Sequence, residues 1–160
     1  MLVSHSLGGG VAQFYADRYP GRVAGLVFVD TIAIPGYVDW FGPTVDDGSS
    51  IIDMRRTGED WESIGSFGST PTIVLTQNFQ GEDDFAPQRF RRYFRQVHEE
   101  LAGRSSDSLH VIAVDSGHTI QETSPKLVTA AITEVIEAVR SDQRLAPCDD
   151  RFDGLGGACA

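Results

Sequence analysis

Residues 2–30 read LVSHSLGGGVAQFYADRYPGRVAGLVFVD, and this stretch decides the fold class. It opens on the apolar pair Leu2-Val3, passes through a glycine-rich turn and continues into a segment whose apolar residues recur at helical spacing. Tyr19-Pro20-Gly21 is typical of a helix end. The run from Gly25 to Val29 is typical of a buried strand. The stretch therefore predicts a strand, a tight turn, a helix and a second strand, in that order.

The rest of the chain continues this alternation. Thr72 to Leu75 and Leu109 to Val114 are short apolar runs without clear period-two alternation, which indicates parallel strands covered on both faces. A helical pattern lies between them, and Ser124-Pro125 is typical of the start of another helix. Apolar residues at helical spacing mark the first of these helices: Phe90, Phe94, Val97 and Leu101. Strands that alternate with helices predict an open α/β sheet.

Two segments interrupt the alternation and set the expected domain limits. Residues 31–70 contain prolines and many glycines and are expected to form a short irregular insertion. Residues 141–160 are polar and then glycine-rich, so a disordered tail is expected after a domain that spans residues 1–140. Cys148 and Cys159 both fall in this tail and are interpreted as incidental thiols, with a disulfide across the tail as the alternative.

Composition limits the classes of partner. The chain has 160 residues, a formal net charge of −10 and a pI of about 4.6, so nucleic acid and anionic lipid are poor partners. No apolar run approaches the roughly 20 residues of a membrane span. The location stays unassigned, with the cytoplasm as the default expectation. A signal peptide encoded upstream would lie outside this chain.

The glycine-rich turn carries a candidate nucleophile. A sharp turn between a strand and a helix exposes a serine hydroxyl, and small residues two positions before and after it relieve crowding. Ser4 and Gly8 are the small residues around Ser6 in SHSLGG. The backbone N–H of Leu7, at the start of the following helix, is then placed to donate to an oxyanion. The simpler interpretation is a glycine-rich turn whose serine caps a helix.

Residues 2–30 resemble the nucleophile strand, turn, helix and next strand of the α/β-hydrolase fold family. Ser4 departs from the glycine usual at that position. The resemblance implies a mostly parallel sheet flanked by helices, with residues 31–70 in the place of the family's cap. Family members build several strands and helices before the nucleophile turn. The resemblance therefore implies that this chain is a C-terminal part, with a second oxyanion donor upstream and little activity on its own.

The resemblance also predicts the base. The family orders its catalytic residues as serine, acid, histidine, so the histidine should follow the last strand of the chain. Gly117-His118 follows the run Leu109 to Val114 and precedes the helix that Pro125 opens, which favours His118. The other three histidines have structural interpretations: His5 inside the turn and pointing away from the serine, His98 on an arginine-rich helix, and His110 within a strand.

The acid has three candidates. Asp30 ends the strand Gly25 to Val29, at the edge where open α/β sheets gather functional groups, and it is preferred. Asp84 and then Asp83 are the alternatives, because many family members carry the acid after the next strand. Asp115 lies too close to the histidine in sequence to be the usual choice.

The resemblance implies a serine hydrolase that cleaves an ester, amide, thioester or lactone of a small-molecule acyl substrate through an acyl-enzyme, without a cofactor or metal. A non-catalytic binding protein with the same fold is the alternative. Substrate specificity is expected from residues 31–70, whose large apolar side chains either line a pocket or pack the insertion onto the sheet: Ile32, Ile34, Tyr37, Trp40, Phe41 and Trp61.

Overall fold

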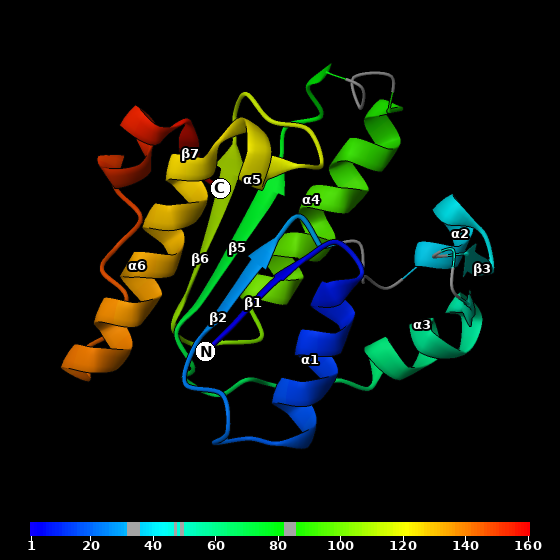
Figure 1. Cartoon of the computed structure of the whole chain (residues 1–160), viewed down its shortest axis with the longest axis horizontal. Helices are drawn as coiled ribbons and strands as arrows, with labels where there is room; N and C mark the ends of the chain where they lie inside the picture. The colour runs from blue at the N-terminus through cyan, green and yellow to red at the C-terminus, as the bar shows by residue number, and fades with distance from the viewer. Residues whose placement is uncertain (32–35, 47, 49, 82–85) are drawn as a thin grey trace.

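A computed structural model covers residues 1–160 and describes all of them except 32–35, 47, 49 and 82–85. Its centre is a five-stranded sheet in which the first four strands are parallel and the last is antiparallel (Figure 1). The expected fold class, a mostly parallel sheet flanked by helices, is confirmed. The strands in spatial order are β1 (Leu2–His5), β2 (Leu26–Val29), β5 (Thr72–Gln77), β6 (Ser108–Ala113) and β7 (Gly157–Cys159).

Helices cover both faces of the sheet. On one face lie α1 (Gly8–Arg18) and α4 (Gln88–Ala102), and α3 (Met54–Glu62) packs farther out on that side, against α1. On the other lie α6 (Pro125–Ser141) and a C-terminal 3₁₀ helix, η2 (Asp150–Leu155). Side chains of β2 alternate between these two cores, because successive residues of a strand point to opposite faces.

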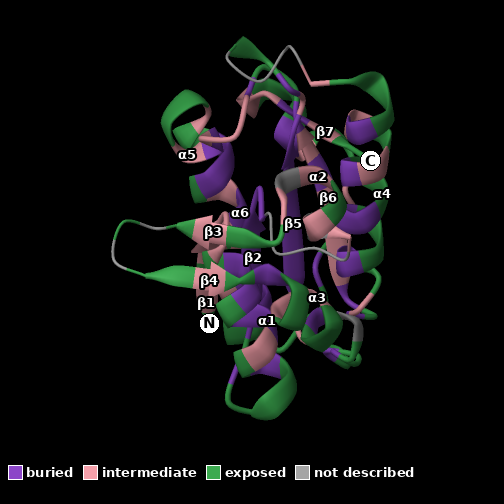
Figure 2. Cartoon of the chain, turned by 90° about the vertical axis from the view of Figure 1, so that its right-hand side faces the viewer, coloured by how far each residue is buried: buried purple, intermediate pink, exposed green. Residues whose placement is uncertain are grey.

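The central strands are buried throughout, whereas the edge strand is not. Every residue of β2 and β5 is buried (Figure 2), which is consistent with the all-apolar sequence of β2 and the apolar centre of β5. Within the described part of the chain, β1 lies at the edge of the sheet, pairs with β2 and is only half-buried. The four parallel strands follow the expected runs closely, but β5 extends beyond Leu75 to Gln77. This extension places two polar residues, Thr76 and Gln77, at the carboxyl end of a buried strand.

The insertion at residues 31–70 is more regular than expected. It contains α2 (Tyr37–Phe41), an antiparallel hairpin of β3 (Thr44–Asp46) and β4 (Ile51–Asp53), and α3. Asp53 caps α3 by accepting a hydrogen bond from the N–H of Arg55.

The two tryptophans of the insertion are packing residues. Trp61 is 2% exposed and stacks against Phe14 of α1, with ring centroids 6.4 Å apart. Trp40 contacts Phe90 of α4, at 4.9 Å between centroids. Ile32, Ile34 and the side chains of Tyr37 and Phe41 lie outside the described structure, so their expected place in a pocket stays a prediction.

The expectation of a disordered tail over residues 141–160 is wrong. The segment forms η2 and then β7, which pairs antiparallel with β6 and covers the edge of the sheet. Phe152 is 1% exposed and belongs to the core beneath α6. Cys148 and Cys159 form a disulfide, not two free thiols. The glycine-rich composition suggested disorder, but burial of Phe152 and the disulfide hold this segment in place.

Among the described residues, no helix combines the length and the apolar character that crossing a bilayer requires. The same residues contain no group of three or more histidine, cysteine, aspartate or glutamate side chains arranged to hold a metal ion.

Candidate functional site

Ser6 lies in the turn between β1 and α1, with a φ of 55°. A non-glycine residue rarely adopts this left-handed conformation, because its Cβ crowds the following carbonyl oxygen. The turn is held from β2: the N–H of Ser6 donates to the carbonyl of Val29 at 3.3 Å. A strained residue held in this way presents its side chain at the carboxyl ends of the parallel strands.

The close approach in this turn occurs at Gly9, one residue beyond the small position expected from the sequence. A Cβ at Gly9 would lie 1.8 Å from Oγ1 of Thr31, whereas a Cβ at Gly8 would meet only the Cβ of Ser4, at 4.0 Å. Thr31 directly follows β2, and its Oγ1 donates to the carbonyl of Ser6 at 2.9 Å. The absence of a side chain at Gly9 therefore lets Thr31 reach the turn.

Replacing Gly9 with alanine is expected to destabilise the fold by roughly 1–3 kcal/mol, because the new methyl group overlaps Thr31. Gly8→Ala is the matched control, since its methyl group finds ordinary contact space within a helix, where alanine is favoured by roughly 1 kcal/mol. Urea unfolding of the two variants measures the difference. Equal stability of the two would contradict the assigned contact.

Asp30 ends β2 and is completely buried, with a φ of 43°. Its carboxylate accepts two hydrogen bonds from Gln77, from the backbone N–H at 2.8 Å and from Nε2 at 3.0 Å. Burial raises the pKa of Asp30 above its ordinary value of 3.8, and hydrogen bonds from His118 and from the Gln77 backbone oppose that rise. Gln77 was not identified from the sequence.

His118 lies between Ser6 and Asp30, in the loop from β6 to α5 (Ile120–Thr123). Its Nδ1 is 2.7 Å from Oδ2 of Asp30, and its Nε2 is 3.0 Å from Oγ of Ser6. A carboxylate at Nδ1 favours the tautomer with the proton there, and this leaves the Nε2 lone pair to accept from the serine hydroxyl. The structure thus brings together the three residues that the sequence favoured, from three separate elements.

The loop that carries His118 is held from two sides. Nε2 of His5 donates to the carbonyl of His118 at 2.9 Å, and the two imidazole rings lie 4.6 Å apart between centroids. The Oγ atoms of Ser116 and Ser124 are 2.9 Å apart. Ser124 takes the expected cap position before α6, but its hydroxyl makes this loop contact and does not cap the helix. His5 therefore supports the histidine loop, although it was expected only to point away from the serine.

The turn also orients the predicted oxyanion donor. Leu7 directly precedes α1, and the next N–H groups, of Gly9 and Gly10, donate to the carbonyls of Ser6 and Leu7. Within the described part of the chain, the N–H of Leu7 donates to no acceptor. A helix N-terminus adds a partial positive charge at this point.

The alternative acids are not placed by the structure. Asp83 and Asp84 lie outside the described residues, so they remain alternative candidates for the acid. Asp115 is exposed on the histidine loop, and it makes no ion pair to a described residue.

A second polar group, which the sequence did not reveal, lies behind Asp30 on the α4 side of the sheet. We call it the histidine–threonine network: His110, Thr76, His98 and Thr31. Oγ1 of Thr76 is 2.7 Å from Nε2 of His110 and 2.6 Å from Nδ1 of His98. Nε2 of His98 is 2.7 Å from the carbonyl oxygen of Thr31. One signal for it was available, since the sequence TQ closes an apolar run at the carboxyl end of a strand.

Burial keeps both histidines of the network neutral. It lowers the pKa of His98 from 6.5 to about 3, and it lowers that of His110 to about 4, with the charge of Arg95 acting in the same direction. His98 is fully buried and lies among the buried residues of α4.

Acidification is expected to weaken the fold through these two residues. In the unfolded chain they bind protons below pH 6.5, and in the folded chain only near pH 4 and 3, so the unfolded state binds more protons across that window. The free energy of unfolding should fall by roughly 2 kcal/mol per histidine between pH 7 and pH 5. Urea titrations at the two pH values measure this fall. His98→Gln should show a smaller dependence, and an equal dependence would contradict the assignment.

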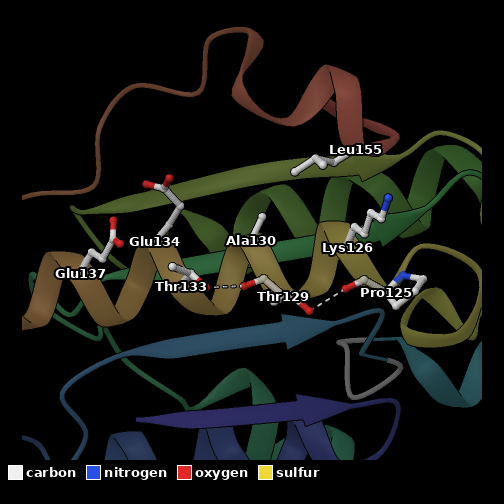
Figure 3. A pocket seen from close by; sticks show the side chains of 8 residues that line it. All are labelled: Pro125, Lys126, Thr129, Ala130, Thr133, Glu134, Glu137 and Leu155. Carbon is white, nitrogen blue, oxygen red and sulfur yellow. Dashed lines mark hydrogen bonds between the residues drawn. The ribbon is translucent and has the colours of Figure 1, made fainter.

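A hollow of about 560 Å³ lies elsewhere, along the outer face of α6 and beside η2 (Figure 3). Its two threonine hydroxyls bond back to carbonyls of the helix, Thr129 to Pro125 and Thr133 to Thr129. We assign no ligand to it. It is lined by Pro125, Lys126, Thr129, Ala130, Thr133, Glu134, Glu137 and Leu155.

Comparison with known proteins yields one likeness of structure. No protein-family profile matches the chain, and no curated protein matches its sequence. The chain is similar to the crystal structure of a probable hydrolytic enzyme from Pseudomonas aeruginosa PAO1, with 20% sequence identity and a TM-score of 0.48. The match covers 84% of this chain and 62% of that structure.

Proposed function

We propose that the protein is a serine hydrolase that cleaves an ester, amide or related carbonyl compound through an acyl-enzyme. One observation carries the proposal: the continuous hydrogen-bonded series from Asp30 through His118 to Ser6, with contacts of 2.7 and 3.0 Å. A serine hydroxyl is a weak nucleophile unless a base can take its proton, and an oriented imidazole is such a base.

In the proposed reaction, Ser6 attacks the substrate carbonyl while His118 takes the hydroxyl proton at Nε2. Asp30 holds the proton on Nδ1 and stabilises the imidazolium that forms. His118 then protonates the leaving group. Water, activated by the same imidazole, attacks the acyl-enzyme and releases the acid, so that Ser6 recovers its proton.

The carbonyl oxygen of the substrate becomes negatively charged during the attack and needs a hydrogen-bond donor. We assign this role to the backbone N–H of Leu7. It adjoins Ser6 and lies at the start of α1. Loss of one such donor costs other hydrolases about 10²–10³ in rate. The direction of this N–H depends on the backbone turn at Ser6. The turn at Ser6 and Leu7 therefore fixes both the position of the nucleophile and the direction of the donor.

Labelling with a fluorophosphonate probe tests the proposal. The purified chain is incubated with the probe, and the adduct is located by mass spectrometry of the peptides. We expect one stoichiometric adduct, on Ser6. It should form much more slowly when the chain is first denatured in urea. A chain that takes no label while folded would favour the alternative function, a non-catalytic binding protein.

The base is tested in the same assay. His118→Ala should remove labelling, because no other described imidazole bonds to Oγ of Ser6. Asp115→Asn is the control, since Asp115 is exposed on the same loop and makes no ion pair to a described residue. Labelling of His118→Ala at the wild-type rate would exclude His118 as the base.

A further inference from the structure

The histidine–threonine network has a single consistent direction of donation. The carbonyl of Thr31 can only accept, so Nε2 of His98 carries a proton and donates to it. Nδ1 of His98 is then an acceptor, and the hydroxyl of Thr76 donates to it. The oxygen of Thr76 in turn accepts from Nε2 of His110. Each group is fixed by the next, and the series ends at Thr31.

Thr31 joins this network to both ends of the proposed catalytic series. It directly follows Asp30 in the chain, and its hydroxyl donates to the carbonyl of Ser6 at 2.9 Å. Thr31 is fully buried and packs into the space that Gly9 leaves open. Its backbone position therefore affects the turn at Ser6 and the carboxylate at Asp30 together.

We propose that His98 is a positioning residue for the proposed reaction: by holding the carbonyl of Thr31, it fixes the nucleophile turn and the acid relative to each other. The proposal rests on the proposed function. Its physical ground is that Ser6 and Asp30 both have left-handed backbones, with φ of 55° and 43°. Non-glycine residues keep such conformations only where the surroundings over-determine them.

The β5 strand supports both halves of this arrangement. Thr76 and Gln77 are adjacent, so their side chains point to opposite faces of the sheet. The side chain of Thr76 bonds to His98, whereas the side chain of Gln77 donates to Asp30. The backbone N–H of Gln77 donates to the same carboxylate. The end of one buried strand thus holds the acid directly and, through His98, the residue after it.

Two substitutions at His98 separate positioning from simple packing. In His98→Gln the side-chain amide nitrogen can take the place of Nε2 and still donate to Thr31, whereas the side chain of His98→Asn is too short to reach it. Both remove the imidazole, and asparagine also leaves more of its buried volume empty. A role in packing alone therefore predicts a loss of stability in His98→Asn without a change in reactivity at Ser6 or at the His118–Asp30 bond. A positioning role predicts that both of these are affected in His98→Asn and rescued by glutamine.

A second pair covers the case in which His98→Asn fails to fold. Thr76→Val removes the hydroxyl that orients His98. Thr72→Val makes the same change on the same face of β5, where the hydroxyl bonds only to the carbonyl of Thr70 in the described structure. Thr72→Val should leave the site unchanged.

Two readouts are measured on the full chain. The first is fluorophosphonate inactivation, separated into its maximal rate and its probe-binding constant. We expect the maximal rate to fall roughly 10- to 100-fold in His98→Asn and in Thr76→Val, with the probe-binding constant unchanged. In His98→Gln the maximal rate should stay within about threefold of wild type. The second is the NMR signal of the Nδ1 proton of His118, which the bond to Asp30 shifts downfield. It should broaden in the same two variants.

The two readouts distinguish the failures. If wild type takes no label but the proton signal responds as expected, the proposed function fails and the positioning by His98 stands. If wild type is labelled, and His98→Asn and Thr76→Val keep both its maximal rate and its proton signal, the positioning role is overturned. Equal losses in His98→Gln and His98→Asn, or a loss in Thr72→Val, would also overturn it.

Discussion

Ser6→Ala is expected to abolish phosphonylation and any ester turnover that the chain shows, because removal of a nucleophile costs about 10⁶-fold in rate when the acid and base cannot act without it. The physical reason is direct. Oγ of Ser6 is the atom 3.0 Å from Nε2 of His118, and alanine has no atom there to attack a carbonyl. Time-resolved release of p-nitrophenolate from p-nitrophenyl acetate measures the loss, and probe labelling provides the independent check.

Ser4→Ala is the matched control for this experiment. Ser4 lies two residues earlier on β1, and its buried Oγ has no hydrogen-bond partner in the described structure. Its removal should leave labelling close to wild type. A Ser6→Ala protein that is still labelled, or a Ser4→Ala protein that is not, would transfer the nucleophile to another residue.

Asp30→Asn is expected to lower turnover by about 10⁴-fold while the fold is retained. The asparagine amide can donate to Nδ1 of His118, which moves the imidazole proton to Nε2 and removes the acceptor for the hydroxyl of Ser6. The variant should bind the fluorophosphonate as wild type does but react slowly, so the loss should appear in the maximal rate of inactivation.

Asp83→Asn and Asp84→Asn test the alternative acids in the same assay. Neither should change the maximal rate if Asp30 fills this role. A loss of about 10⁴-fold in one of them, with Asp30→Asn active, would place the acid in the loop after β5 and leave Asp30 as a structural residue that Gln77 and His118 hold.

The features of this protein that could be predicted are those that depend on short stretches of sequence. The strand, turn and helix around Ser6 follow from small residues and helical periodicity between residues 2 and 21, and the structure places them there. The buried strands were recognisable because covering on both faces demands unbroken apolar runs. The position of His118, after the last parallel strand, was predicted from the order of catalytic residues in the family that the sequence resembles.

Other features needed elements that are distant in the chain to come together. Local sequence does not reveal that Thr31 enters the space above Gly9, or that the buried imidazole of His98 reaches the carbonyl of Thr31. The C-terminal segment was misjudged for the same reason: its glycines suggested disorder, and only pairing with β6 and burial of Phe152 show why it is ordered.

The sequence by itself determined the four parallel strands, the sharp turn at Ser6 and the serine that it presents, because local backbone preference and burial pattern act over a few residues. The tertiary structure decided that the carboxylate of Asp30 meets His118. Asp30 and His118 are separated by 88 residues, and parallel pairing of β2, β5 and β6 is what brings the carboxyl ends of their strands to one edge. Among the described carboxylates it is Asp30 that this pairing places within 2.7 Å of Nδ1.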